Sequence, residues 1–244
     1  MLTVSHLSKQ YAGADTAAVQ DLSFSFEKGQ IIGLLGPNGA GKTTTISILC
    51  GLINDFEGEI TILGHNRRTQ SAELQRKISV VPQQIALYPT LSCRENLLYY
   101  GRMYQIPEAK LNQLIADYLQ QFGLFEHADK QIKHFSGGMK RRANIIASLL
   151  HEPELLILDE PTAGVDVQSR SMILQFLRDF QQKGHSVIYT SHLLDEAESI
   201  CKSILIIDQG KKIIQGEPAV LVEQAAARNL EDLFIKLTGR HVRD

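Results

Sequence analysis

The feature that most constrains this fold is a continuous apolar run that leads directly into a glycine-rich loop. Residues 30–35 are apolar from Ile31 onward, and the run ends at Gly36. Such a run is typical of a strand that is buried on both faces of a parallel sheet. A helical pattern begins near Gly41, and its apolar side is formed by Ile46, Ile48, Leu49 and Leu52. The order of strand, loop and helix predicts an α/β fold.

Strand and helix patterns alternate along much of the chain. They predict further strands over residues 2–4, 18–27, 58–64, 79–81, 155–159, 186–190 and 203–207. They predict helices over residues 167–182 and 193–201, and in the tail that starts at Pro218. Alternation of this kind favours a mostly parallel sheet with helices on its faces.

Between residues 84 and 150 the apolar pattern is helical. Its members are Leu97, Leu98, Tyr100, Gly101, Leu111, Leu114, Ile115, Tyr118 and Leu119. We therefore expect one domain over residues 1–244. In it, a core (1–83 and 151–217) carries an inserted helical subdomain (84–150) and a helical tail (218–244).

Composition excludes several classes of protein. With 25 basic and 27 acidic residues, the chain gives no reason to expect a nucleic-acid partner. The basic cluster Lys140-Arg141-Arg142 fits a solvated helix start or a phosphate contact. Cys50, Cys93 and Cys201 have no metal-binding spacing, so they are predicted to be reduced structural thiols. No apolar stretch reaches the roughly 18 residues of a membrane helix, so we expect a chain that is soluble by itself.

A phosphate-binding pattern, G-x-x-x-x-G-K-[ST], lies between the buried strand and the helix. Its residues are Gly36, Pro37, Asn38, Gly39, Ala40, Gly41, Lys42 and Thr43. Glycines let backbone amides approach a triphosphate closely, and the helix directs free amides at it. Lys42 is predicted to bridge the β- and γ-phosphates, Thr43 to bind Mg²⁺, and Thr44 to donate to a phosphate. The alternative is a chance match in an ordinary turn, which the flanking strand and helix disfavour.

Two acids follow the apolar strand at residues 155–158. A buried strand can present carboxylates only at the rim of its sheet. Asp159 is predicted to hold Mg²⁺ through water, and Glu160 to polarise an attacking water as a general base. An ordinary strand end with solvated acids is the alternative.

The run Phe135-Ser136-Gly137-Gly138-Met139 lies between the phosphate loop and these acids. This order of motifs resembles the nucleotide-binding subunit of ATP-binding cassette (ABC) transporters, over nearly the whole chain. The resemblance implies an α/β P-loop NTPase with a mostly parallel core sheet, an N-terminal antiparallel β part and an inserted helical subdomain. ATP and Mg²⁺ are the implied cofactors.

The resemblance also implies roles for three residues outside these motifs. Tyr11 matches the aromatic residue that stacks on adenine, with an ordinary tyrosine in the core as the alternative. Gln83 matches a glutamine that reaches Mg²⁺ and the attacking water and faces the membrane partner. His192 matches a histidine that contacts the γ-phosphate and orients Glu160 and the water.

Other matched residues are implied to act on the nucleotide of a second subunit. Ser136, Gly137 and Gly138 would contact its γ-phosphate, and Asp166 matches a loop that crosses between subunits. One chain would then hold half of each active site, and the partner would be a second ATPase subunit, most simply an identical chain.

Two departures from the family pattern point to a branch of it. Met139 stands where glutamine is commonest, and Val165 stands where leucine is usual. With the flanking residues 135–142 and the tail Leu230–Arg240, these variants resemble exporters of the drug-resistance and polysaccharide type.

We therefore expect an ATPase subunit, peripheral at the cytoplasmic face of a membrane, that drives a separate transmembrane permease for export of a drug, lipid, polysaccharide or similar cargo. The surface for the permease is expected beside Gln83, over residues 87–91. A soluble ABC ATPase of assembly, such as iron–sulfur cluster biogenesis, is the alternative. DNA-repair and chromosome-structuring members are disfavoured because no sustained heptads occur, and translation-acting members because they carry two cassettes.

Overall fold

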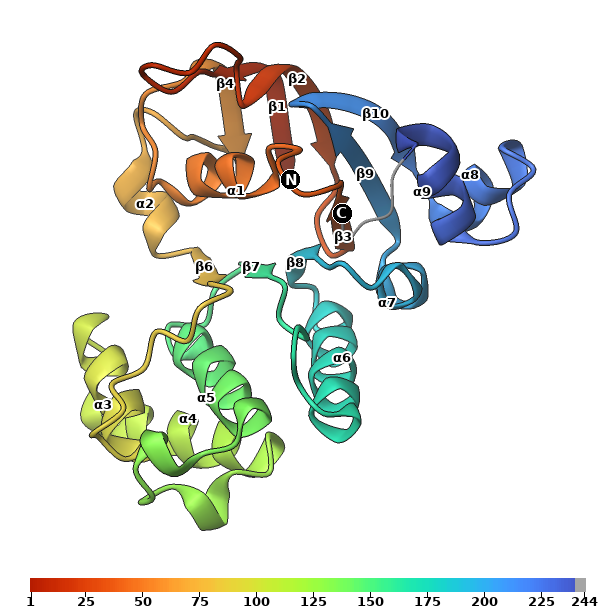
Figure 1. The fold of residues 1–244 in the computed structure, drawn as a ribbon. Coiled ribbons are helices and arrows are strands. Elements are labelled where there is room, and N and C mark those ends of the chain that lie inside the picture. Colours follow the sequence, from red (N-terminus) through yellow and green to blue (C-terminus); the bar gives the residue numbers. More distant parts are fainter. Residues whose placement is uncertain (240–244) are drawn as a thin grey trace.

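The computed structural model describes residues 1–239, and two sheets organise it (Figure 1). The smaller sheet is antiparallel and has the order β2 (Val19–Phe26), β1 (Leu2–Lys9), β4 (Glu57–Ile62) and β5 (His65–Asn66). The N-terminal antiparallel part expected from the sequence is therefore confirmed.

The larger sheet has six strands in the order β10-β9-β3-β8-β7-β6. Their bounds are β3 (Ile31–Leu35), β6 (Ile78–Val81), β7 (Leu155–Asp159), β8 (Ser186–Thr190), β9 (Ser203–Asp208) and β10 (Lys211–Gly216). Every pairing in this sheet is parallel except that of β10 with β9. The mostly parallel core sheet is also confirmed.

Strand β3 is buried on both faces because two hydrophobic cores meet on it. Ile32 and Leu34 belong to a core shared with the antiparallel sheet and with α1 (Lys42–Cys50). Ile31 and Leu35 belong to a second core that extends into the helices on the other face. Alternate side chains of a strand point to opposite faces, so an uninterrupted apolar run is what this central position requires.

The remaining helices are α2 (Ser71–Gln75), α3 (Cys93–Met103), α4 (Glu108–Gln121), α5 (Gly137–Leu149), α6 (Val167–Gln182), α7 (Leu194–Ile200), α8 (Pro218–Gln224) and α9 (Leu230–Thr238), with 3₁₀ turns at Phe125–His127 and Ile132–His134. Helices α5 and α6 pack against the larger sheet, and α8 and α9 lie beside its β9–β10 edge (Figure 1). In the part of the chain that the structure describes, no helix has the length and apolar character of a membrane span.

Helices α3, α4 and α5 form a group to one side of the sheets (Figure 1). Ser92 and Glu95 form a reciprocal capping box at the start of α3. Gly101 lets α4 approach closely, since a Cβ there would lie 2.1 Å from Leu111 Cδ1. The helical character of this segment is as predicted, while our boundaries at residues 84, 151 and 218 stay predictions.

Two predictions about the N-terminal half were wrong. The first strand continues to Lys9 instead of ending at Val4, because register shifts after Val4 break the alternation on which the prediction depended. Leu52 does not face the core with α1 and is 78% exposed. The helix ends before Gly51, which adopts a left-handed backbone with φ 90°.

Strand β10 was not predicted. It forms a hairpin with β9 through Gln209 and Gly210, which both have positive φ as a tight two-residue hairpin turn requires. The strand is partly exposed along its length, so it lacks a clear apolar alternation. In the tail, Leu230, Leu233 and Phe234 are fully buried as expected, while Arg240 lies outside the described residues.

Candidate active site

The phosphate loop joins the end of β3 to the start of α1, as predicted. Its backbone conformation needs glycine, because Gly39 has φ 79° and Gly41 has φ 100°. A Cβ on Gly41 would also lie 2.4 Å from the carbonyl oxygen of Ala18. Gly41 is the N-cap of α1 and supplies no side-chain cap, so the first amides of the helix remain available for an anion.

Lys42 lies at the centre of this loop. Its Nζ donates to the carbonyl oxygens of Gly36 at 2.6 Å and of Pro37 at 3.0 Å, and the side chain is buried. Burial lowers the pKa of the Lys42 amine, and the nearby carboxylates of Glu160 and Asp159 oppose that shift. The loop therefore folds around a buried cation.

Two further predicted nucleotide contacts lie beside the loop. The Tyr11 hydroxyl is 3.2 Å from Thr44 Oγ1, and the tyrosine is 44% exposed. Lys9 Nζ lies 5.3 Å from the centre of the Tyr11 ring. Because the ring is accessible to a ligand, Tyr11 is not the core tyrosine that the alternative reading required. Thr43, at the start of α1, is exposed.

Asp159 and Glu160 lie at the carboxyl end of β7, and Thr190 of the neighbouring strand β8 holds them together. Thr190 Oγ1 donates to Asp159 Oδ1 at 2.7 Å and accepts from the Glu160 amide at 3.0 Å. Glu160 has φ 49°, a left-handed conformation that costs free energy for a residue with a side chain. Such strain is common at functional sites.

The Glu160 carboxylate is held by side chains from the two strands that flank β7. Its Oε2 accepts from Gln83 Nε2 at 2.8 Å, and its Oε1 contacts His192 Nε2. Gln83 follows β6 and His192 follows β8, so three adjacent parallel strands deliver the group to one edge of the sheet. Glu160 is only 8% exposed, which excludes the alternative of a solvated strand end.

These residues line one cleft of about 480 Å³. The lining consists of Ala18, Asn38, Gly39, Ala40, Gly41, Lys42, Thr43, Thr44, Gln83, Glu160 and His192. The structure thus brings together the phosphate loop and the three residues predicted to act on water.

The predicted signature residues do not line this cleft. Ser136 is the N-cap of α5, where its hydroxyl accepts from the Met139 amide at 3.2 Å. Gly138 packs tightly against the start of α6, since a Cβ there would lie 2.6 Å from Asp166 Oδ2. The signature and the crossing loop of one chain therefore contact each other.

Asp166 has a clear structural role in the single chain. Its carboxylate caps α6 and accepts from the amide and the hydroxyl of Ser169 at 2.9 and 2.8 Å. These bonds lower the pKa of the Asp166 carboxyl.

Sequence reasoning missed Arg141, which is buried and not part of a solvated helix start. Its guanidinium donates to the carbonyl oxygens of Pro82 at 2.9 Å and Gln83 at 2.6 Å. Arg141 therefore connects helix α5, which begins at the signature, to the residue that holds Glu160. Arg141 lies three and four residues before the buried Asn144 and Ile145, but charge alone predicted a solvated side chain, and only the contacts with residues 82–83 show its burial.

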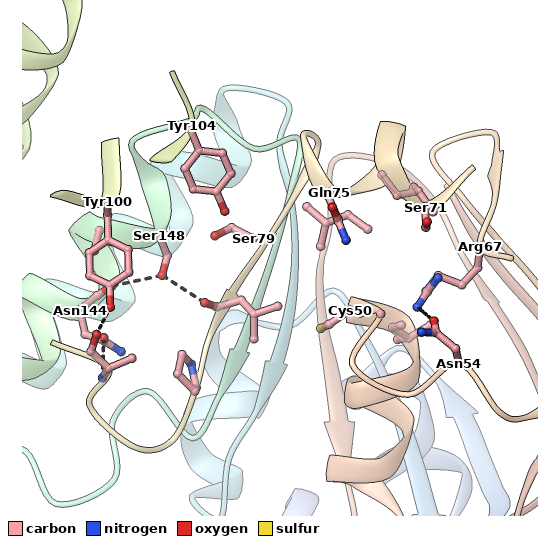
Figure 2. Close-up of a pocket in the computed structure, with 18 residues that line it drawn as sticks. Cys50, Asn54, Arg67, Ser71, Gln75, Ser79, Tyr100, Tyr104, Asn144 and Ser148 are labelled. Atoms are coloured by element: carbon pink, nitrogen blue, oxygen red, sulfur yellow. Dashed lines mark hydrogen bonds between the residues drawn. The ribbon is translucent and has the colours of Figure 1, made fainter. Parts of the chain in front are cut away.

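A second cavity, of about 400 Å³, is lined in part by Pro82 and by none of the phosphate-loop residues (Figure 2). Figure 2 shows Tyr100, Tyr104, Asn144, Ser148 and Ser79 on one wall. The opposite wall carries Cys50, Asn54, Arg67, Ser71 and Gln75. The cavity thus separates the α3–α5 group from α1 and α2.

The side chains near the cleft supply some of the ligands that a magnesium ion needs, and the others would have to come from phosphate and water. The described residues contain no cluster of three or more His, Cys, Asp or Glu side chains that could hold a metal by themselves. Thr43, Asp159 and Gln83 offer hydroxyl, carboxylate and amide oxygens, which Mg²⁺ accepts alongside water and phosphate oxygens. The site therefore fits a magnesium ion that arrives with a phosphate ligand.

Comparison with known proteins identifies the family. A family model described as "ABC transporter" matches residues 19–163, which is more than half of the chain. The chain belongs to the ABC transporter family. The resemblance that we inferred from its motifs is therefore confirmed, and the chain is an ATP-binding, ATP-hydrolysing subunit of this family.

Individual relatives agree with this assignment. Linearmycin resistance ATP-binding protein LnrL of Bacillus subtilis (strain 168) is 46% identical over 238 residues, which cover 98% of this chain and 75% of that protein. Nod factor export ATP-binding protein I of Cupriavidus pinatubonensis (strain JMP 134 / LMG 1197) is 36% identical over 234 residues, covering 96% and 71%. A solved ATP-binding subunit of an ABC transporter is 30% identical with a TM-score of 0.87, covering 97% and 99%.

Replacing Arg141 with methionine should lower ATP turnover without lowering ATP affinity. The substitution leaves two partly buried carbonyl groups without their donor and frees the segment that carries Gln83, whereas the phosphate loop is untouched. We expect kcat to fall by about tenfold, in line with a small misplacement of a reacting group. Lys140→Met on the preceding residue is the matched control. An Arg141→Met enzyme that retains full kcat would show that this link does not support Glu160.

Proposed function

We propose that this chain hydrolyses ATP on the cytoplasmic face of a membrane, as a peripheral subunit that drives export through a separate transmembrane permease. The observation that carries the catalytic part is the meeting of Gln83, Glu160 and His192 at the mouth of the phosphate loop. Export is supported by the relatives, which are named for linearmycin resistance and Nod factor export. The cargo is a drug, lipid, polysaccharide or similar molecule.

ATP binds with its phosphates along the loop and its base on Tyr11. The amides of residues 38–43 and the Lys42 ammonium then surround the phosphates, with Lys42 exchanging its contacts to Gly36 and Pro37 for phosphate oxygens. Thr44, whose hydroxyl faces Tyr11, donates to a phosphate from the side of the base.

Glu160 acts on the water that attacks the γ-phosphate. A water in line with the bond to be broken gives up its proton to the Glu160 carboxylate, and the γ-phosphoryl group leaves as inorganic phosphate with ADP as the other product. Gln83 and His192 hold the carboxylate from both sides, so it needs little rearrangement to orient the water. His192 also lies where its ring can contact the γ-phosphate.

Magnesium would be held by Thr43, Asp159 and Gln83 together with the phosphate oxygens. When bound, it neutralises charge on the β- and γ-phosphates. Asp159 is fixed for this role by Thr190, and Gln83 donates through Nε2 to Glu160, which leaves its amide oxygen for the ion or its water.

A second copy of the chain completes each site. Ser136, Gly137 and Gly138 start helix α5 away from the cleft of their own chain, and both Ser136 and Gly137 are exposed. A helix start of this kind binds anions through its free amides. It therefore contacts the γ-phosphate held by the partner copy, and the Asp166 loop packed against it reaches the same interface.

The permease docks into the cavity beside Pro82 through a helix at its cytoplasmic side. Pro82, which lines the cavity, directly precedes Gln83, so an occupant there can change the contact of Gln83 with Glu160. Asn144 Nδ2 is buried without a hydrogen-bond partner, although the Oδ1 of the same side chain accepts from the Ala86 amide at 3.1 Å. The occupant can supply the missing acceptor.

Within residues 87–91, where we expect a contact with the permease, exposure differs from residue to residue. Leu87 belongs to the core, so it cannot contact a partner. Tyr88 is 45% exposed and packs edge-on against Tyr99. Tyr104 is 44% exposed and stacks on His151 with 3.9 Å between ring centres. Tyr88, Tyr99 and Tyr104 therefore all keep exposed aromatic surface on or beside helix α3, and Tyr104 also lines the cavity.

Lys42→Ala should weaken ATP binding by about 10- to 100-fold, the effect expected from losing charge-assisted hydrogen bonds worth about 1.5–3 kcal/mol. Equilibrium binding of a fluorescent ATP analogue measures it, with Lys140→Ala as the matched control. Unchanged affinity in Lys42→Ala would remove the phosphate-loop assignment.

Glu160→Gln should retain ATP binding and lose hydrolysis by about 10²- to 10⁴-fold, because an amide cannot accept the proton. The variant should also form a dimer only when ATP is present, which light scattering after gel filtration detects. Glu223→Gln, at an exposed position on α8, is the control. Turnover near the parent rate in Glu160→Gln would exclude Glu160 as the catalytic carboxylate.

Tyr88→Ser combined with Tyr104→Ser should lower recovery of a polytopic membrane protein with the tagged chain from detergent-solubilised native membranes. Losing about 2 kcal/mol of binding free energy at an aromatic residue in the interface raises the Kd for the permease by more than tenfold. Val220→Ser on α8, which removes another exposed apolar side chain, is the control.

Intact recovery of the permease after both tyrosine substitutions would exclude this docking surface. Recovery of soluble partners alone with the parent chain would favour an assembly ATPase instead.

A further inference from the structure

A buried carboxylate that none of these roles uses bonds to residues that lie close in the chain to Glu160 and His192. Glu196, on α7, is 3% exposed. Burying a charged group costs free energy unless hydrogen bonds and an opposite charge compensate it. The partners of Glu196 therefore indicate what this charge is retained for.

One oxygen of Glu196 collects hydroxyl donors from three places in the chain. Oε2 accepts from Thr162 Oγ1 at 2.6 Å, from the Tyr189 hydroxyl, and from Ser191 Oγ at 3.4 Å. Burial and the neighbouring carboxylate raise the pKa of the Tyr189 phenol, so it stays protonated and donates. All three donor residues are buried.

The other oxygen faces helix α6. Oε1 lies 3.1 Å from Arg170 Nε, as an ion pair without hydrogen-bond geometry. Arg170 is one turn from Asp166, which caps the same helix, and its amide bonds to the Asp166 carbonyl oxygen at 2.9 Å. The Arg170 side chain is 35% exposed.

Each partner belongs to a segment that carries a residue of the proposed site. Thr162 is two residues after Glu160, and Ser191 immediately precedes His192. The Ser191 hydroxyl also accepts from the Leu193 amide at 2.9 Å, which fixes the turn around His192. Arg170 ties in the helix that begins at Asp166. A single carboxylate thus connects three separate segments.

We propose that Glu196 is a positioning residue that holds the Glu160, His192 and Asp166 segments in register with one another through Thr162, Ser191 and Arg170. The inference rests on the proposed ATP hydrolysis at Glu160. Glu196 makes no contact with the phosphate loop among its described partners, so its role lies in turnover and not in ATP binding.

The test uses Arg170→Met, which removes the ion pair but leaves the buried hydroxyl cluster in place. Arg170→Lys keeps the positive charge, and Arg178→Met lies about two turns further along α6 as a matched control. Glu196→Gln and the double variant Arg170→Met/Glu196→Gln complete a cycle. For each full-length variant we would measure kcat for ATP hydrolysis, the Kd for ATP and the unfolding temperature.

Arg170→Met should lower kcat by about tenfold, as expected for a misplaced catalytic group, with Kd for ATP within about twofold of the parent. Arg170→Lys should recover most of that loss in kcat. The double variant should be no slower than the slower single variant, because both substitutions break the same Arg170–Glu196 interaction. Arg170→Met should unfold at a lower temperature than Arg178→Met, because it leaves the buried Glu196 carboxylate without its opposite charge, so kcat is compared well below both unfolding transitions.

A merely structural Glu196 predicts a different pattern. An unfolding temperature that falls while kcat stays at the parent value would overturn the positioning role. So would equal kcat in Arg170→Met and Arg178→Met, or a double variant whose losses simply add. Absence of ATP hydrolysis in the parent chain would instead overturn the proposed function, and this inference with it.

Discussion

The candidate site depends on two contacts of the Glu160 carboxylate, a hydrogen bond from Gln83 and a contact with the His192 ring. Each of the three residues follows a different strand, and the strand order β8-β7-β6 places them side by side. The parallel sheet is thus required by the chemistry, since only parallel neighbours end at the same edge. Thr190 adds a further tie, because its hydroxyl fixes both Asp159 and the strained backbone of Glu160. A free carboxylate at a flexible strand end would have to be oriented in each catalytic cycle.

Two buried charges extend this arrangement beyond the cleft. Arg141 connects the Gln83 segment to helix α5, so movement of the α3–α5 group reaches Glu160 through Gln83. Glu196 connects the His192 turn to helix α6 on the opposite side. The proposed docking cavity lies against the first of these links, beside Pro82. A partner bound in the cavity and a nucleotide bound at the phosphate loop would therefore both affect the contact between Gln83 and Glu160.

The sequence predicted those parts of the fold that depend on local pattern. Strands β3 and β7 are almost entirely apolar, β8 has an apolar centre, and the phosphate loop has fixed spacing, so each could be located without tertiary information. Tertiary contacts decided the rest. Arg141 sits in a basic cluster that looks solvated, and only the packing of α5 against residues 82–83 shows that it is buried. Glu196 was missed because its partners are far apart in sequence, and β10 because a hairpin turn, not apolar alternation, specifies it.

We propose that each active site is divided between two copies of the chain. Asn38 in the phosphate loop and Ser136 at the start of α5 are both exposed, and only the first lines the cleft. The most direct test is oxidative cross-linking of Asn38→Cys on one chain to Ser136→Cys on another, in the Glu160→Gln background. We predict a disulfide between chains that forms with ATP and fails to form when Lys42→Ala is added. A disulfide that forms equally without ATP, or none at all in the presence of ATP, would contradict the claim.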